Sequence, residues 1–286
     1  MESSNHRVVA LLGHGVIPPN SPPIAADDLG FTRGDGCFDA MRVVRDAHGV
    51  RVDHRDRHLA RFARSAAAMD LPPIDVSAWA GLIDQAAAAW TGDGEAVCKV
   101  IWTRGGEFVA SDPVGVVLIA PGPASCVPLR VAGLHTGRTS DAFRNAPWLL
   151  GGVKTISYAM NAAAKREANR RGVDDALFIS SDGYLLEGPT SALVVARDGL
   201  LDTTPTQDTG ILASVTVYVL REHAAQHGRE FRERLIQPEE LNLVDGAWLV
   251  SAIRGVCPII ELDGRSVAFS PRISHTLARW AGFAAA

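Results

Sequence analysis

Apolar residues that recur every three or four positions predict several helices along this chain. In residues 54–69, Leu59, Phe62 and Met69 recur at this spacing, so one face of the predicted helix is apolar. The same reasoning predicts helices over residues 76–90, 157–171 and 213–227, and a short helix at the C-terminal end. Ser157 is suited to cap the third of these helices, and Gly172 follows its end.

Short apolar runs bounded by turn residues predict β-strands between these helices. The tripeptide Ser181-Asp182-Gly183, between two such runs, is typical of a β-hairpin. Strands outnumber helices and do not alternate with them regularly, so we expect an α+β (mixed α/β) fold rather than repeated βαβ units. The predicted strands cover residues 7–12, 37–44, 96–103, 114–120, 129–134, 176–180, 184–186, 191–196, 247–253 and 258–262.

The segment Pro121-Gly122-Pro123-Ala124-Ser125 divides the chain, because two prolines and a glycine after a strand stop any ladder or helix. We therefore predict a small α/β domain over residues 1–120, a linker over 121–125 and a larger α/β domain over 126–286. A length of 286 residues agrees with two domains of ordinary size.

Composition excludes several classes of protein. With 47% hydrophobic and 21% charged residues, the chain is neither disordered nor collagen-like. The longest apolar runs fall short of the ~20 residues that span a bilayer, and we expect no secretory signal. The net charge of −4 provides no excess of positive charge that would attract nucleic acid or an anionic membrane. We therefore expect a cytoplasmic protein whose partner is a small molecule.

Cysteine and histidine patterns do not indicate a metal or disulfide site. The four cysteines lack CxxC spacing, and we expect free thiols in a reducing cytosol. His54 and His58 are four residues apart, but no glutamate follows His54 as it does in zinc proteases. We interpret the two histidines as a surface pair.

Lysine chemistry is easy to locate because the chain has only three lysines, Lys99, Lys154 and Lys165. Lys154 follows a glycine pair and precedes a predicted helix, a setting in which it could be buried and deprotonated for Schiff-base chemistry. Lys165 lies among charged residues on a predicted helix, which favours a solvated position. Lys99 is in a strand and could face either way.

Two further positions suggest a bound cofactor, each with a structural alternative. Glu187 ends an apolar strand, where a carboxylate is costly to bury unless it is paired with a cation such as a protonated ring nitrogen. The alternative is a strand-end charge that faces water. Residues 212–216 begin a predicted helix, and helix N-termini favour phosphate, although most are merely capped.

Five short motifs in register resemble the class IV aminotransferase family, the fold-type IV pyridoxal-phosphate enzymes. The resemblance covers almost the whole chain and implies the family's two-domain fold. The motifs are Arg33-Gly34-Asp35-Gly36-Cys37-Phe38, His58-Leu59-Ala60-Arg61, Val153-Lys154-Thr155, Glu187-Gly188 and residues 212–216.

The resemblance implies pyridoxal 5′-phosphate as cofactor and a role for each matching residue. Lys154 matches the lysine that carries the cofactor and later moves protons. Glu187 matches the carboxylate that keeps the pyridine nitrogen protonated, and Arg61 matches the arginine that grips the phosphate. The other implied cofactor-binding residues are Val215, Thr216, Ser251 and Ala252 at the phosphate, Ser191 beside the ring, and Tyr158. The family is usually dimeric, so we expect a homodimer whose larger domain carries most cofactor contacts.

Three positions depart from the family's usual pattern and affect only the expected fine geometry. Asp39 stands where the family usually has Glu. Ala192 replaces an Asn, and Ala213-Ser214 replaces a Pro-Gly.

Local patterns favour one member of the family, 4-amino-4-deoxychorismate lyase, whose substrate carries two carboxylates. Arg33 stands where branched-chain aminotransferases have an aromatic residue. The segment after Arg104 lacks the Arg-x-His pattern of D-amino-acid aminotransferases. The predicted substrate-binding residues are Arg33, Phe38, Lys99, Arg104 and Arg254.

Two other functions stay open at this point. The first is a transaminase that acts on a D-amino acid, a branched-chain amino acid or an (R)-amine. In that case some of these arginines could form structural ion pairs instead of binding a substrate. A further alternative is a non-catalytic protein that binds a small molecule.

Overall fold

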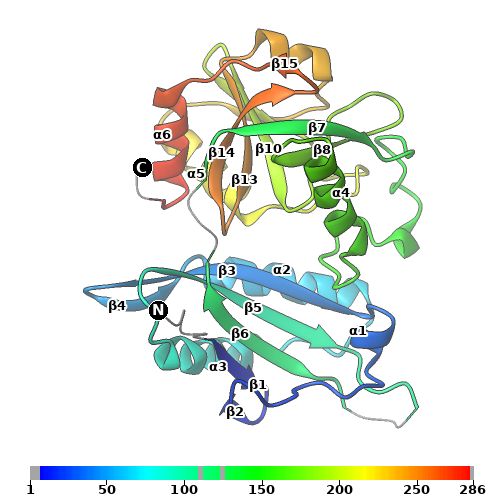
Figure 1. Ribbon diagram of the computed structural model, residues 1–286, viewed down its shortest axis with the longest axis vertical. Helices are drawn as coiled ribbons and strands as arrows, with labels where there is room; N and C mark the ends of the chain where they lie inside the picture. The colour runs from blue at the N-terminus through cyan, green and yellow to red at the C-terminus, as the bar shows by residue number, and fades with distance from the viewer. Residues whose placement is uncertain (1–6, 109–111, 123–125, 284–286) are drawn as a thin grey trace. The chain divides into compact units, whose positions relative to one another are not determined.

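The computed structural model describes residues 7–108, 112–122 and 126–283 (Figure 1). The chain divides into two compact units. The first comprises Met1–Pro123 together with Val153–Tyr158, and the second comprises Ala124–Gly152 and Ala159–Ala286. Within the described residues, no helix is long and apolar enough to cross a membrane. The mixed α/β architecture that we predicted is confirmed.

The first unit is built on an antiparallel sheet of six strands in the order β2-β1-β6-β5-β3-β4. Buried side chains of α2, α3 and one sheet face form a single core, which includes Phe62, Trp79 and Met41. The strands are β1 (Val8–Leu11), β2 (Gly15–Ile17), β3 (Gly36–Asp46), β4 (Gly49–Val52), β5 (Glu95–Thr103) and β6 (Gly115–Pro121). The helices are α1 (Leu29–Thr32), α2 (Arg55–Ala68) and α3 (Val76–Ala89).

The second unit is built on a mixed sheet of nine strands, with the path β12-β11-β10-β13-β14-β7-β8. Strand β9 pairs with β10, and β15 pairs with β14. The strands are β7 (Leu129–His135), β8 (Asp175–Ile179), β9 (Glu187–Gly188), β10 (Ser191–Arg197), β11 (Leu200–Thr203), β12 (Phe231–Glu233), β13 (Gly246–Ser251), β14 (Gly255–Leu262) and β15 (Arg265–Ser266). The helices are η1 (Pro147–Leu149), α4 (Ala159–Arg170), α5 (Val215–Gln226), η2 (Pro238–Leu243) and α6 (Pro271–Trp280).

Both faces of this second sheet are buried, which explains the unbroken apolar runs of β10 and β13. Leu193 and Leu249 belong to a core on one face, whereas Val194 and Trp248 belong to a core on the other. Helices α5 and α6 also contribute to the second core, for example through Leu220 and Leu277.

The division between the units differs from our expectation at one place. The segment Val153–Tyr158 belongs to the first unit, although we predicted that all of residues 126–286 form the second domain. The physical reason is that its backbone pairs with β3, as described below. Residues 123–125 of the predicted linker lie outside the described residues.

The main predicted helices are present, with two local corrections. The helix expected from Ser157 begins at Ala159, because the Ser157 hydroxyl donates to the Gly34 carbonyl oxygen (3.1 Å) instead of capping. Residues 184–186 turn back on β8 as the hairpin signal predicts, but they form an isolated antiparallel bridge rather than a regular strand. Leu185 bridges Ile179, and the amides of Ser180 and Leu186 donate to the carbonyl oxygens of Tyr184 and Phe178, both at 2.9 Å.

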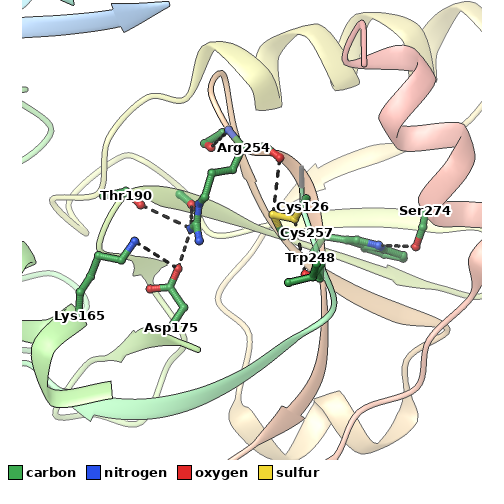
Figure 2. Close-up of a disulfide and its surroundings, with 11 residues drawn as sticks. Cys126, Lys165, Asp175, Thr190, Trp248, Arg254, Cys257 and Ser274 are labelled. Carbon is green, nitrogen blue, oxygen red and sulfur yellow. Dashed lines mark hydrogen bonds and ion pairs between the residues drawn. A yellow bond between two sulfur atoms is a disulfide. The ribbon is translucent and has the colours of Figure 1, made fainter. Parts of the chain in front are cut away.

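The expectation of four free thiols is wrong. Cys126 and Cys257 form a disulfide with a Cα–Cα distance of 5.4 Å (Figure 2). Cys37 and Cys98 are free and buried, and burial raises the pKa of each thiol to about 12. These two thiols therefore stay protonated and unreactive at neutral pH.

Candidate functional site

The predicted site residues are distributed over both units, and each unit carries a distinct set of groups. The first unit carries Arg33, Phe38, Arg61, Lys99, Arg104, Lys154 and Tyr158. The second carries Glu187, Ser191, Val215, Thr216, Ser251, Ala252 and Arg254.

The segment that carries Lys154 is held against the start of β3. The Phe38 amide donates to the Lys154 carbonyl oxygen, and the Ile156 amide donates to the Gly36 carbonyl oxygen, both at 2.9 Å. The Lys154 amide donates to the hydroxyl of the buried Ser65 on α2 (3.2 Å). The backbone on both sides of the lysine is therefore fixed.

The two glycines of the first motif make this close approach possible. A Cβ on Gly34 would collide with the Ser157 hydroxyl, and Gly34 has a φ of +72°, which favours glycine. A Cβ on Gly36 would lie 2.6 Å from the Trp102 carbonyl oxygen. The sequence motif is thus a requirement of the backbone that supports Lys154.

The side chain of Lys154 lies among aromatic rings. Its Nζ is 4.5 Å from the ring centroid of Phe38 and 5.5 Å from that of Tyr158. These two rings meet edge to face, with centroids 5.3 Å apart. The two rings therefore limit where the amine can point.

Below this segment, a buried carboxylate holds Arg61. Asp39 Oδ2 accepts from Arg61 Nε and Asp39 Oδ1 accepts from Arg61 Nη2, both at 2.8 Å. His58 Nδ1 lies 2.8 Å from the same Oδ1. Burial alone would raise the pKa of Asp39, but the charge and hydrogen bonds of Arg61, with those of His58, hold it well below its usual value. Our interpretation of His58 as a surface residue is wrong, since its side chain is buried in this cluster.

The other predicted cations of the first unit differ in their surroundings. Arg33 is exposed (66% of its side chain) and pairs with Glu107 at 2.8 Å. Lys99 is exposed on β5. Arg104 binds both carboxylate oxygens of Asp35 and the carbonyl oxygens of residues 69 and 70, which is the structural alternative considered for this arginine.

In the second unit, Glu187 lies in β9, and its side chain contacts the backbone just before α5. Both of its carboxylate oxygens are 3.3 Å from the Leu212 amide, which donates to them. Glu187 is half-buried and pairs in register with Ala192 of β10. The backbone amide of Leu212 therefore orients the carboxylate.

The N-terminus of helix α5 (Val215–Gln226) carries the predicted phosphate-contact residues Val215 and Thr216. Ser214 caps it, since its hydroxyl accepts from the Val217 amide (3.3 Å). The first amides of a helix, here those of Val215 and Thr216, have no acceptor within the helix and suit a phosphate group. Thr216 is also buried and adds a hydroxyl. Ser251 and Ala252 stand at the turn between β13 and β14.

Arg254 is the centre of a polar cluster that the sequence did not indicate (Figure 2). Its Nη2 lies 2.6 Å from Asp175 Oδ2 and donates to the Ser191 hydroxyl at 2.7 Å. Lys165, which we expected on a solvated helix face, directs its Nζ to within 3.9 Å of the same Asp175 oxygen. In the sequence, Asp175 precedes an apolar run, which is the one signal that it could be buried. The sequence does not show which of the many arginines pairs with it.

Comparison with known proteins identifies the relatives of this chain. The family model for amino-transferase class IV matches residues 36–262. A curated relative from Mycobacterium tuberculosis, named a bifunctional aminodeoxychorismate lyase / D-amino acid transaminase, is 36% identical over 280 residues, covering 92% of this chain and 94% of that protein. A D-alanine aminotransferase from Bacillus licheniformis is 25% identical over 248 residues, covering 84% and 83%.

Solved structures agree with this similarity. A hypothetical aminotransferase from Mycobacterium tuberculosis in its PLP-bound form has a TM-score of 0.89 and 33% identity, covering 96% of this chain and 97% of that chain. A fold IV transaminase from Curtobacterium pusillum has a TM-score of 0.86 and 36% identity, covering 96% and 98%.

Proposed function

Because the chain belongs to the class IV aminotransferase family and is therefore a pyridoxal-phosphate-dependent enzyme, we propose that it acts as an aminodeoxychorismate lyase. In this reaction 4-amino-4-deoxychorismate loses pyruvate and leaves 4-aminobenzoate, the aromatic precursor used in folate synthesis. The observation that carries the proposal is the similarity, over nearly the full length of both chains, to the relative whose name includes this lyase activity.

The chain's groups fit the cofactor. An oriented amine (Lys154) suits its aldehyde, a carboxylate held by a backbone amide (Glu187) suits its pyridine nitrogen, and the N-terminus of α5 suits its phosphate. We propose Ser251 and Ala252 as further phosphate contacts, with Ser191 and Tyr158 beside the ring. When bound, the cofactor supplies an electron sink for the carbon that carries the substrate amine.

The proposed proton transfer rests on Lys154. With the cofactor bound, Lys154 Nζ would accept a proton from the substrate ring as the C–O bond to the enolpyruvyl group breaks. It would return that proton to the leaving group, which departs as pyruvate. The aromatic walls formed by Phe38 and Tyr158 keep this amine oriented during the step. Glu187 would favour the protonated form of the cofactor's ring nitrogen, since an ionised carboxylate stabilises a positive charge beside it.

For the substrate carboxylates we propose Arg33, because an exposed ion pair is easily exchanged for another anion. Phe38 and Lys99 remain part of this proposal. Arg104 is already bound by Asp35 and by backbone carbonyls, so its contacts support a structural role.

A second candidate function is transamination of D-amino acids. The name of the same Mycobacterium tuberculosis relative includes this activity, and a D-alanine aminotransferase is also similar to this chain. Against it stands the absence of an Arg-x-His pattern after Arg104, although residues 109 and 110 of that segment lie outside the described residues. Family membership does not support the third alternative, a non-catalytic binding protein.

A direct test measures two products from the purified holoenzyme. Pyruvate release from aminodeoxychorismate is followed in one assay, and amino transfer from D-amino acids to keto acids in the other, with Lys154→Ala as the inactive control. Lyase turnover well above transfer supports the proposal. Transfer without pyruvate release from aminodeoxychorismate would reject it in favour of the transaminase.

We also propose that the enzyme is a homodimer in the cytoplasm. Large apolar side chains, including Phe31 (75% exposed) and Trp148 (75% exposed), are of the kind that interfaces cover. Light scattering coupled to size-exclusion chromatography should give twice the mass of one chain. Disulfides are rare in a reducing cytoplasm, so thiol titration of denatured protein from freshly lysed cells tests the location. A Cys126–Cys257 disulfide that is fully formed in those cells would reject it.

A further inference from the structure

We propose that Asp175 and Arg254 form a positioning pair that holds the turn between β9 and β10, and with it Glu187 and Ser191. In this view Arg254 acts on the site through the turn and does not bind the substrate. The inference rests on the proposed role of Glu187 toward the cofactor.

The carboxylate of the pair is buried and therefore needs a cation beside it. Asp175 is fully buried at the start of β8. Its Oδ1 accepts from the Ala176 amide (2.9 Å), whereas its Oδ2 lies 2.6 Å from Arg254 Nη2. An ionised carboxylate in such a position is strongly destabilising unless a cation stays beside it. Lys165, with its Nζ at 3.9 Å, is the more distant and more exposed of the two nearby cations.

Arg254 connects this carboxylate to the turn. The nitrogen that faces Asp175 also donates to the Ser191 hydroxyl (2.7 Å) and makes a long contact with the Thr190 hydroxyl (3.5 Å). Figure 2 shows Arg254 between Asp175 and Thr190. Its own backbone is fixed, because the Arg254 amide donates to the Ser251 hydroxyl (3.1 Å). The guanidinium therefore links β8 and the turn from a rigid base.

Strand register carries this restraint to Glu187. Ser191 pairs with Gly188, and Ala192 pairs with Glu187. A Cβ on Gly188 would lie 3.2 Å from the Ala176 carbonyl oxygen, so the turn packs closely on the strand that carries Asp175. Loss of the anchor at Ser191 should therefore displace the Glu187 carboxylate by a fraction of an ångström to about 1 Å, which is enough to lower turnover about 100-fold.

The same geometry argues against a substrate role for Arg254. A substrate carboxylate that captured the Nη2 group would take it from Asp175 and leave a buried charge unpaired. Arg33 is itself exposed and its partner Glu107 is only half-buried, so Arg33 can change partners at a lower cost.

The test compares D175N, R254M and the double variant D175N/R254M, with K165Q as the matched control at the edge of the same cluster. Hydrogen–deuterium exchange at residues 187–192 is measured in the cofactor-free protein, together with the melting temperature. We expect each single variant to exchange at least about tenfold faster at these residues, because the anchor is lost. The double variant should regain much of the melting temperature, since no unpaired buried charge remains, but should keep the fast exchange. K165Q should match wild type.

Kinetics of the reconstituted holoenzyme supply the second readout. A positioning role predicts that D175N and R254M lower kcat by a similar factor, with KM changed less than about twofold, and that their effects are not additive. If R254M does not fold, R254K takes its place in the comparison, because lysine keeps a charge beside Asp175 but lacks the guanidinium that also reaches Ser191. A raised KM in R254M with wild-type exchange at 187–192, or a D175N variant indistinguishable from wild type, would overturn the inference.

The outcome is separable from that of the proposed function. Exchange in the cofactor-free protein needs no substrate, so fast exchange in the variants of an enzyme that releases no pyruvate upholds the inference while rejecting the lyase. The kcat comparison then uses whichever substrate the holoenzyme turns over.

Discussion

Replacing Asp39 by asparagine should destabilise the first unit strongly, although the side chain keeps its size. Asp39 is fully buried, and the side chain of Arg61 beside it is only 8% exposed. The asparagine retains one acceptor oxygen but presents an NH2 group where Oδ2 accepts from Arg61 Nε. The substitution therefore removes the counter-charge and places two donors face to face.

The expected cost is about 3–5 kcal/mol in the free energy of unfolding, the range found when one partner of a buried ion pair is removed. For a chain of this size that corresponds to a melting temperature lower by about 10 °C. Since the pKa of Asp39 is lowered in the folded protein, its stabilisation is present above the unfolded-state pKa of about 4 and is lost as the pH falls below it. The variant should therefore show a shallower loss of stability than wild type as the pH falls from about 5 to 3.

Urea unfolding at pH 7 and along this acid range measures both effects, with fluorescence quenching on addition of pyridoxal phosphate as a readout for Arg61. Asp56, which lies on α2 with Arg61 and has 86% of its side chain exposed, supplies the control D56N. We expect this control to lose at most about 1 kcal/mol, since it removes one charge near the helix N-terminus. A D39N protein that unfolds like D56N and keeps the acid slope of wild type would refute the reasoning. So would a double variant D39N/R61M that is no more stable than D39N, because the penalty is assigned to the unpaired guanidinium.

Three further predictions concern the chemistry. Borohydride reduction followed by peptide mapping should place the cofactor on Lys154, whereas a label on Lys99 or Lys165, or none, would contradict the assignment. Glu187→Gln should keep the cofactor but lose most turnover, because a neutral amide cannot hold the ring proton; near wild-type kcat would argue against this role. Arg33→Ala should lower kcat/KM about 10- to 100-fold for a substrate with two carboxylates and much less for a monocarboxylate amine donor, with an unchanged melting temperature because the ion pair is exposed. An unchanged ratio between the two substrates would remove the main argument from this chain's residues for a lyase.

The regular elements of the fold could be predicted because their signals are local. Helix α2 and the buried strand β10 each follow from one stretch of sequence. Strand β11 could not, because it places a fully buried Asp202 in a run of four residues. That aspartate is stabilised by Arg232 and Arg234, which only the fold brings together.

Within the candidate site, motifs predicted the residues that would meet a cofactor, and the structure shows what supports them. Gly34 and Gly36 were part of a recognisable pattern, but their steric reason needs the position of the lysine segment. The Asp175–Arg254 pair and the Cys126–Cys257 disulfide, whose cysteines are 131 positions apart, carry no spacing signal. Long-range pairing of this kind cannot be predicted from composition or periodicity.

The assignment of Val153–Tyr158 to the first unit limits how domains of related enzymes can be recombined. A single recombination event at the boundary near residue 123 would unite the β3 motif of one parent with the lysine segment of another. Any mismatch between them would fall on the tight contact of Gly34 with Ser157 and on the two backbone bonds beside Lys154. Chimeras within the family should therefore tolerate a donor's first unit only when the six residues around the lysine come from that same donor.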